Sequence, residues 1–345
     1  MLLIDLGADP VVIEDPVYGR EEVDDPVLID IVNSDCMART KGLNQYGPPR
    51  EWYHTDGFSR YDHCVGTMTL LRRLGARVEE QAAGLLHDAS HYAFSHVADW
   101  VLGNTAAEDN ADSEHGSILR RFGVDELLSR HGLDLDSILR KDSFSLLEQP
   151  APALCADRLD YTLREVSLTH NDPVTAARLG AALRNVDNRI VFYDSASANE
   201  FAMLYLECNQ SHWAGPEAVV RYHILSEAVL HAMRSGLFKK DYLFGDDRFA
   251  SDALRIAGGL LSERGDSIVD RNISMLERGY DLVPDPDGVY LGMKKFRWVD
   301  PDFIQDGVVV RLSEVNPAYA SLVERSRSSL KAGATVRPVP RSDSD

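Results

Sequence analysis

Apolar residues recur at helical spacing along most of this chain of 345 residues. The helical period holds from residue 29 to 43, and later runs end on glycine stops at Gly75, Gly103, Gly123 and Gly132. Pro152 opens a further predicted helix that continues to about residue 168. Three more helical stretches are predicted at about 197–211, 217–235 and 249–278. The pattern therefore predicts a mostly helical protein.

Strand-like segments are few. Residues 11–13 (Val-Val-Ile) lie between turn-forming Asp-Pro and Tyr-Gly pairs, and residues 189–193 follow an Asp-Asn turn. Further along, strands are predicted over 288–299 and 307–312, followed by one amphipathic helix over 317–331. We therefore expect a helical domain (1–280), a small C-terminal α/β lobe (281–331) and a disordered tail (332–345).

The charge of the chain restricts its partners. The formal net charge is −19, and only 7 of the 36 cationic residues are lysines. Nucleic-acid binding relies on a basic surface that neutralises phosphates, so a nucleic-acid partner is not expected. A phosphate-bearing ligand can bind only where a metal ion and a few arginines reverse the field locally.

The sequence also indicates where the protein works. Its apolar runs are shorter than the roughly 18–20 residues that a membrane-spanning helix needs. The N-terminal residues lack the features of a signal peptide, and the four cysteines are scattered without a Cys-x-x-Cys pair. We expect a cytoplasmic protein with reduced thiols and no membrane partner.

The chemistry-bearing residues begin with a dense histidine segment. His87, His91 and His96 fall within ten residues of one another, together with Asp88 and Asp99. An apolar approach over residues 82–86 places the first histidine and its neighbouring aspartate at the buried end of a helix, where unpaired polar groups are costly. Imidazole and carboxylate together suit a divalent metal ion.

Two adjacent residues cannot complete a metal shell, so further ligands must come from elsewhere. His63 opens the preceding helical pattern, and Asp157 lies in the helical run 154–165. Each has an ordinary alternative interpretation. His63 could be a polar residue at a helix N-terminus, and Asp157 could pair with Arg158 or Tyr161 on the surface.

The order His63, His87-Asp88, Asp157 resembles the HD superfamily of metal-dependent phosphohydrolases. Three segments around it are similar to the deoxynucleoside triphosphate triphosphohydrolase (dNTPase) branch: Phe58-Ser-Arg-Tyr-Asp-His63-Cys-Val-Gly, His87-Asp-Ala-Ser-His-Tyr-Ala-Phe-Ser-His96 and Asp157-Arg-Leu-Asp-Tyr161. Residues 15–19, 39–47 and 294–301 also resemble that branch, and the likeness extends over about 13–325. It implies an HD-domain helical core with a short N-terminal β-hairpin and a small C-terminal α/β lobe.

The resemblance assigns a role to each matching position. A divalent ion (Mn, Fe, Mg, Zn, Co or Ni) would be held by His63, His87, Asp88 and Asp157. His91 would be the catalytic imidazole, one helical turn beyond His87. The phosphates would be contacted, directly or through a neighbour, by Arg60, His96, Asp99, Arg158 and Tyr161, since arginine offers forked donors to phosphate oxygens. Gln45 and Glu165 would lie near the sugar.

The implied reaction is hydrolysis of a deoxynucleoside triphosphate to deoxynucleoside and tripolyphosphate, by a homo-oligomer. Three departures bear on it: Ser113 stands where the branch has a second catalytic histidine, Tyr46 replaces a leucine that packs against the sugar, and Ala89-Ser90 replace Ile-Gly. The alternatives are an HD phosphohydrolase acting on a nucleoside monophosphate or signalling nucleotide, and a nucleotide-sensing protein with weak activity.

Several other residues carry no functional prediction. Six histidines have no partner at ligand spacing and are interpreted as surface or core residues: His54, His131, His170, His212, His223 and His231. The pairs Lys239-Lys240 and Lys294-Lys295 are interpreted as solvated faces, and the alternative is that they help bind an effector nucleotide at a subunit interface.

Overall fold

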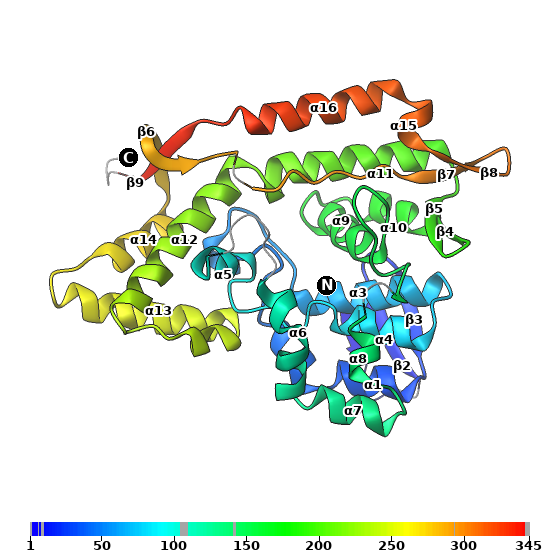
Figure 1. The fold of residues 1–345 in the computed structure, drawn as a ribbon, viewed down its shortest axis with the longest axis horizontal. Coiled ribbons are helices and arrows are strands. Elements are labelled where there is room, and N and C mark those ends of the chain that lie inside the picture. Colours follow the sequence, from blue (N-terminus) through cyan, green and yellow to red (C-terminus); the bar gives the residue numbers. More distant parts are fainter. Residues whose placement is uncertain are drawn as a thin grey trace.

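The computed structural model describes residues 2–341 except 6, 8, 9, 104–109, 141, 142 and 293, and except the side chains of 110–113. The predicted mostly helical fold is confirmed (Figure 1). None of the described helices is both long enough and apolar enough to cross a membrane.

The N-terminal segment forms a three-stranded antiparallel sheet of β1 (Leu3–Asp5), β2 (Val11–Asp15) and β3 (Gly19–Val23). The turn between β2 and β3 is closed by Asp15, whose Oδ1 accepts hydrogen bonds from the backbone N–H groups of Val17 (2.8 Å) and Tyr18 (3.0 Å). Gly19 ends the turn with φ +72°, a left-handed conformation that glycine adopts without strain. The predicted N-terminal hairpin is therefore present.

The helices that follow occupy the centre, the bottom and the right of the view in Figure 1. They are α1 (Pro26–Val32), α2 (Asp35–Thr40), α3 (Arg60–Arg73), α4 (Val78–Leu86), α5 (His96–Val101), α6 (Asn110–Arg121), α7 (Val124–Arg130), α8 (Leu135–Ile138), α9 (Ala156–Leu168) and α10 (Pro173–Ala181), with the 3₁₀ turn η1 (Arg50–Trp52). The predicted run 29–43 is split into α1 and α2, because Ser34 caps α2 by accepting a hydrogen bond from the Met37 N–H.

A second group of helices lies on the left and in the upper right of the same view. It comprises α11 (Ser195–Cys208), the π-helical turn η3 (Asn209–Trp213), α12 (Pro216–Arg234), the 3₁₀ turn η4 (Lys240–Phe244), α13 (Asp247–Ser262) and α14 (Ile268–Arg278). The apolar core has two clusters, one mainly beneath the first group and one mainly beneath the second. Tyr161 and Trp213 pack against both clusters, so they lie where the two halves meet.

The C-terminal segment contributes strands to two sheets, one of which it shares with the helical part. Its strands β7 (Asp302–Gln305) and β8 (Val308–Arg311) extend the hairpin of β4 (Leu183–Val186) and β5 (Arg189–Phe192) in the order β4-β5-β7-β8. The short helix α15 (Leu312–Val315) leads into α16 (Pro317–Lys331), which has the predicted bounds. The C-terminal part is thus built onto the helical part by strand pairing.

Two expectations about this segment differ from the structure. A strand was expected at 288–299, whereas β6 covers Tyr280–Tyr290 and no strand is formed by the described residues of 291–299. Disorder was expected over 332–345, whereas Thr335–Pro340 form β9, which pairs antiparallel with β6 and buries Val336. The pairing partner lies some fifty residues earlier, so the local pattern of the tail could not reveal it. Residues 342–345 lie outside the described part.

A buried ion-pair network joins the N-terminal sheet to α9. Arg164 Nη2 donates to Asp160 Oδ1 at 2.8 Å and to Asp15 Oδ2 at 2.9 Å, and none of the three side chains is exposed. Gly66 of α3 lies against them, and a Cβ atom there would fall 1.8 Å from the same nitrogen. Two carboxylates share one buried cation, so the pairing depends on that single arginine.

We predict that Arg164→Met lowers the free energy of unfolding by about 3–5 kcal/mol, because it leaves two buried carboxylates without a cation. Arg178→Met is the matched control, since its pair with Glu200 is half-exposed and is expected to contribute less than about 1 kcal/mol. Urea unfolding of both variants measures the difference. Equal losses would show that burial of the network does not matter.

Candidate metal centre

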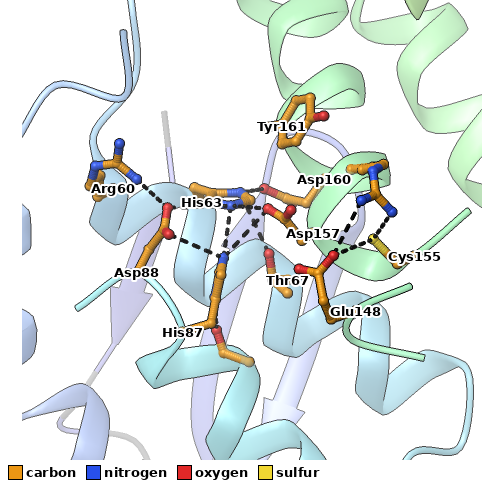
Figure 2. Close-up of polar contacts among 12 residues, drawn as sticks. Arg60, His63, Thr67, His87, Asp88, Glu148, Cys155, Asp157, Asp160 and Tyr161 are labelled. Atoms are coloured by element: carbon orange, nitrogen blue, oxygen red, sulfur yellow. Dashed lines mark hydrogen bonds and ion pairs between the residues drawn. The ribbon is translucent and has the colours of Figure 1, made fainter. Parts of the chain in front are cut away.

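Two imidazoles and two carboxylates from three segments of the chain meet beside α3 (Figure 2). His63 and Asp157 lie in the first turns of α3 and α9, His87 is the C-cap of α4, and Asp88 follows it. His63 Nε2 is 3.1 Å from His87 Nε2 and 3.0 Å from Asp157 Oδ1. That carboxylate oxygen is 3.5 Å from His87 Nε2. Asp88 Oδ1 lies 3.8 Å from His87 Nε2 and Asp88 Oδ2 lies 3.9 Å from His63 Nε2. His63, His87 and Asp88 thus each offer a ligand atom within 4.8 Å of the others, and Asp157 adjoins both imidazoles.

The other ring nitrogen of each histidine is already hydrogen-bonded. His63 Nδ1 is 2.8 Å from Asp160 Oδ2, and His87 Nδ1 is 2.7 Å from the Gly84 carbonyl oxygen. Carboxylate and carbonyl oxygens accept hydrogen bonds, so each Nδ1 carries the proton and each Nε2 is left to bind a cation. Two such nitrogens beside two carboxylates have the composition of a divalent metal site. The residues present therefore fit the ion.

The same geometry makes protons compete for the site. Burial lowers the pKa of His63, but hydrogen bonds with Asp157 and Asp160 outweigh it and raise that pKa above its usual value. The pKa of His87 is also raised, because the charge of Asp88 and the contact with Asp157 outweigh burial. A metal ion has to displace this proton, so binding is expected to weaken as pH falls.

Arg60 holds the outer side of the cluster. It is buried in α3, forms an ion pair with Asp88 and donates through Nε to Ser95 Oγ at 2.9 Å. Its second terminal nitrogen is buried and has no hydrogen-bond partner among the described residues. Burial raises the pKa of Asp88, but the positive charge of Arg60 outweighs this and brings that pKa well below its usual value. Asp88 is therefore an anion.

His91 and His96 form an adjoining pair. The two rings are 5.1 Å apart between centroids, and His91 Nε2 lies 3.1 Å from Asp88 Oδ1. Burial and the charge of Arg60 lower the pKa of His91 to about 4, so its imidazole is neutral at neutral pH. His96 Nδ1 lies 3.2 Å from Asp99 Oδ2, and Asp99 is itself buried. Asp99 thus positions His96.

These groups open into a pocket of about 400 Å³. Ten of the twelve residues assigned from the sequence line it: Gln45, Arg60, His87, Asp88, His91, His96, Asp157, Arg158, Tyr161 and Glu165. The other two, His63 and Asp99, are buried and contact lining residues. The structure therefore brings all twelve positions to one place.

The pocket also contains residues that the sequence analysis did not assign. Lys294, Lys295 and Arg297 all line the pocket. The prediction that the lysine pair is a solvated face is wrong for Lys294, which is partly buried. Lys295 is exposed as predicted, but it also lines the pocket. Lys294 Nζ lies 3.5 Å from the ring centroid of Tyr222. Aromatic side chains complete the wall: Tyr46, Tyr53, Phe58, Trp213 and Tyr222.

Comparison with known proteins agrees with this geometry. Residues 60–165 match the model of the HD domain, a range that includes all four candidate ligands. The uncharacterized protein YdhJ of Bacillus subtilis is 31% identical over 332 residues, covering 94% of this chain and 98% of that protein. The metal-dependent phosphohydrolase cns2 of Cordyceps militaris is 28% identical over 328 residues, covering 92% and 90%. This chain belongs to the HD-domain family of metal-dependent phosphohydrolases.

Two further likenesses are more distant. A phosphohydrolase crystal structure from Bacteroides thetaiotaomicron shares the fold with a TM-score of 0.65 at 18% identity, covering 96% of this chain and all of that chain. The deoxynucleoside triphosphate triphosphohydrolase SAMHD1 homolog of Dictyostelium discoideum is 23% identical over 224 residues, covering 56% of this chain and 43% of that protein.

Some residues that support the HD site were missed in the sequence. Asp160 and Gly84 fix the two histidines, and Ser95 holds Arg60. Asp160 was detectable, because it lies one helical turn after Asp157 within the matched segment. Arg39 could not be detected from the sequence. Its Nη2 donates to the carbonyl oxygens of Ala89 (2.7 Å) and His91 (2.8 Å), and these residues lie far from Arg39 along the chain.

The three departures from the dNTPase pattern have different structural outcomes. Ser113 lies within α6, but its side chain is outside the described part. His115 is buried, with Nδ1 2.6 Å from Ser90 Oγ, and it does not line the pocket. Tyr46 forms part of the wall, with its ring stacked 5.1 Å from Tyr53 and its hydroxyl 3.1 Å from Thr169 Oγ1.

We predict that His87→Ala and Asp157→Ala each abolish stoichiometric binding of Mn²⁺ or Co²⁺ at this site, because each removes a candidate ligand atom that lies next to His63 Nε2. His131→Ala is the control, since that histidine pairs with Asp30 away from the pocket. Metal analysis and isothermal titration of the purified variants measure the effect. Normal affinity in either pocket variant would contradict the ligand assignment.

Proposed function

We propose that this HD phosphohydrolase cleaves deoxynucleoside triphosphates to the deoxynucleoside and tripolyphosphate, with the ion held by His63, His87, Asp88 and Asp157. One observation carries the proposal. A single pocket combines the ion ligands with a group of cations and a group of aromatic rings. A nucleoside polyphosphate has the complementary parts. The distant dNTPase relative and the motif resemblance support the same substrate class.

The cations favour a phosphate chain over a single phosphate. Five cationic side chains line the pocket of a protein with net charge −19: Arg60, Arg158, Lys294, Lys295 and Arg297. Arg158 Nη1 donates to the Gln149 carbonyl oxygen at 2.6 Å, which fixes its positive charge in place. Arg60 and Arg158 are paired with Asp88 and Glu148, and together with Lys294, Lys295 and Arg297 they can neutralise several phosphate oxygens. A monophosphate needs fewer cations than this pocket provides.

The remaining wall suits a nucleoside. Gln45 Oε1 is buried without a hydrogen-bond partner among the described residues, so it can accept from a sugar hydroxyl. Burial raises the pKa of Glu165 to about 8, which keeps the carboxyl protonated and able to donate at neutral pH. The stacked rings of Tyr46 and Tyr53 offer an apolar surface to a base or sugar. In this arrangement the α-phosphorus lies nearest the ion ligands.

Chemistry at that phosphorus divides between the ion and the chain. A divalent ion in such a site activates water and neutralises developing charge. His91, neutral and oriented by Asp88 through Nε2, keeps Nδ1 as a proton acceptor or as a contact for the phosphate chain. Arg60 has an unpartnered buried donor beside the same aspartate, which can bind a phosphate oxygen. A homo-oligomeric assembly and a cytoplasmic location stay predictions.

We predict that His91→Ala keeps its metal but loses about 10²–10⁴-fold in kcat, the range typical for removal of one proton-transfer group. His131→Ala is again the control and should retain wild-type kcat. Steady-state kinetics with parallel metal analysis separates the effects. Wild-type turnover by the His91 variant would show that this imidazole is structural.

The substrate proposal predicts the products. Incubation with a panel of deoxynucleoside triphosphates should release tripolyphosphate and deoxynucleoside. Ribonucleotides should react more slowly if the extra hydroxyl meets Gln45, Tyr46 and Glu165, which line the proposed sugar end of the pocket. Phosphorus NMR and anion-exchange chromatography identify the first product. Orthophosphate as the first product would mean attack at the outer phosphate. Cleavage of monophosphates alone would favour the alternative HD activity, and no turnover with tight binding would favour a sensor.

A further inference from the structure

A second group of potential metal ligands surrounds Glu165 and shares no residue with the HD centre. Glu165 is in the last turn of α9, His170 follows that helix, and His212 lies in the π-helical turn η3 after α11. Each offers one donor atom, and these atoms lie within 4.8 Å of one another. His212 Nδ1 is 3.9 Å from Glu165 Oε1. Neither histidine lines the substrate pocket.

Two of these donor atoms lack a hydrogen bond. Glu165 Oε2 accepts from Trp213 Nε1 at 2.5 Å, whereas Oε1 is buried with no hydrogen-bond partner among the described residues. His212 Nδ1 is also buried and also has no hydrogen-bond partner among the described residues. Burial and the nearby His170 lower the pKa of His212, so its imidazole is neutral. A buried carboxyl oxygen and a buried imidazole nitrogen that face each other unbonded are costly, and a shared cation satisfies both.

A thiol completes the set. Cys208, the last residue of α11, is fully buried, and its Sγ lies 3.8 Å from His170 Nε2. The π-helical turn η3 follows it directly and turns His212 toward Glu165, and such turns occur frequently at functional sites. The four donors are therefore two imidazole nitrogens, a carboxylate oxygen and a sulfur.

We propose that Glu165, His170, Cys208 and His212 form a second metal site that takes a borderline transition ion of the zinc class. Nitrogen, oxygen and thiolate donors in a four-coordinate shell are typical of that ion. Bonds of about 2.0–2.3 Å in a tetrahedral shell place ligand atoms about 3.3–3.6 Å apart. Glu165, His170 and His212 already lie within 4.8 Å of one another. The separations of His212 from Glu165 (3.9 Å) and of Cys208 from His170 (3.8 Å) exceed the shell values by a few tenths of an ångström, and the Cys208 side chain has to move closer to the other ligands when the ion binds. The Cys208 thiol releases its proton when the ion binds.

The metal proposal does not rest on the proposed dNTP hydrolysis, but the two share Glu165. An ion bound there replaces the carboxyl proton, so Glu165 then accepts hydrogen bonds at the pocket instead of donating one. Occupancy would fix the segment after α9 to the end of α11, next to the aromatic wall that contains Trp213. Because the HD centre contains only nitrogen and oxygen donors among its four candidate ligands, the two sites differ in spectroscopy. A thiolate ligand gives cobalt a sulfur-to-metal charge-transfer absorption in the near ultraviolet, and the HD centre gives none.

Cobalt titration of the full-length protein tests the proposal. Wild type should bind two Co²⁺ ions per chain and show the thiolate band. Asp157→Ala should lose the HD ion and keep the band, whereas Cys208→Ser, His170→Ala and His212→Ala should each lose the band and keep the HD ion. Cys155→Ser is the matched control, because Cys155 is also buried but lies near Asp157, and it should keep the band.

The outcomes that overturn the proposal are distinct from failure of the HD function. No band in wild type, or a band that survives Cys208→Ser or disappears in Asp157→Ala, would remove the second site. Zn²⁺ should also raise the melting temperature of Asp157→Ala, since an ion that binds only the folded state stabilises it. That rise should be absent from the double variant with His212→Ala. Circular dichroism in the presence of a chelator verifies the fold of each variant. His170 and His212 are replaced in separate variants, so that each is tested as a ligand by itself.

Discussion

Asp160 is the buried carboxylate on which both the fold and the metal centre depend. Its Oδ1 accepts from Arg164, and its Oδ2 lies 2.8 Å from His63 Nδ1 (Figure 2). Arg164 also binds Asp15 at the end of β2. Because a buried charge without a partner is costly, these contacts hold β2, α3 and α9 in one arrangement. They also fix the tautomer of His63, which leaves its Nε2 to face Asp157 and His87.

The second organising constraint is charge. A chain with net charge −19 repels anions at long range, yet its pocket gathers cations from α3, α9 and the segment 294–297. Segment 294–297 lies between β6 and β7, and the pairing of β6 with β9 and of β7 with β5 holds both of its ends. The C-terminal strands therefore place cationic side chains at a pocket whose candidate metal ligands come from the N-terminal half.

The sequence predicted the parts of the site that are local. His87, Asp88, His91 and His96 lie on one short stretch, so their spacing alone indicates that they lie together. Asp160 could have been predicted in the same way, because it lies one helical turn after Asp157. The histidines of the second cluster were not, because His170 and His212 are 42 positions apart in the sequence and come together through the packing of α11 on α9. Lys294 was interpreted as solvated for the same reason. The residue that it contacts, Tyr222, is distant in the sequence, so no local pattern predicts the contact.

By itself the sequence determined the helical class, the N-terminal hairpin, the ligand types and the family resemblance, because each depends on residues a few positions apart. Only the tertiary structure decided which atoms meet. It turned both imidazole Nε2 atoms toward Asp157, left Glu165 Oε1 facing His212, and gave the tail residues 335–340 a strand partner in β6. Burial and long-range pairing set those contacts, and neither leaves a periodic signal in the chain.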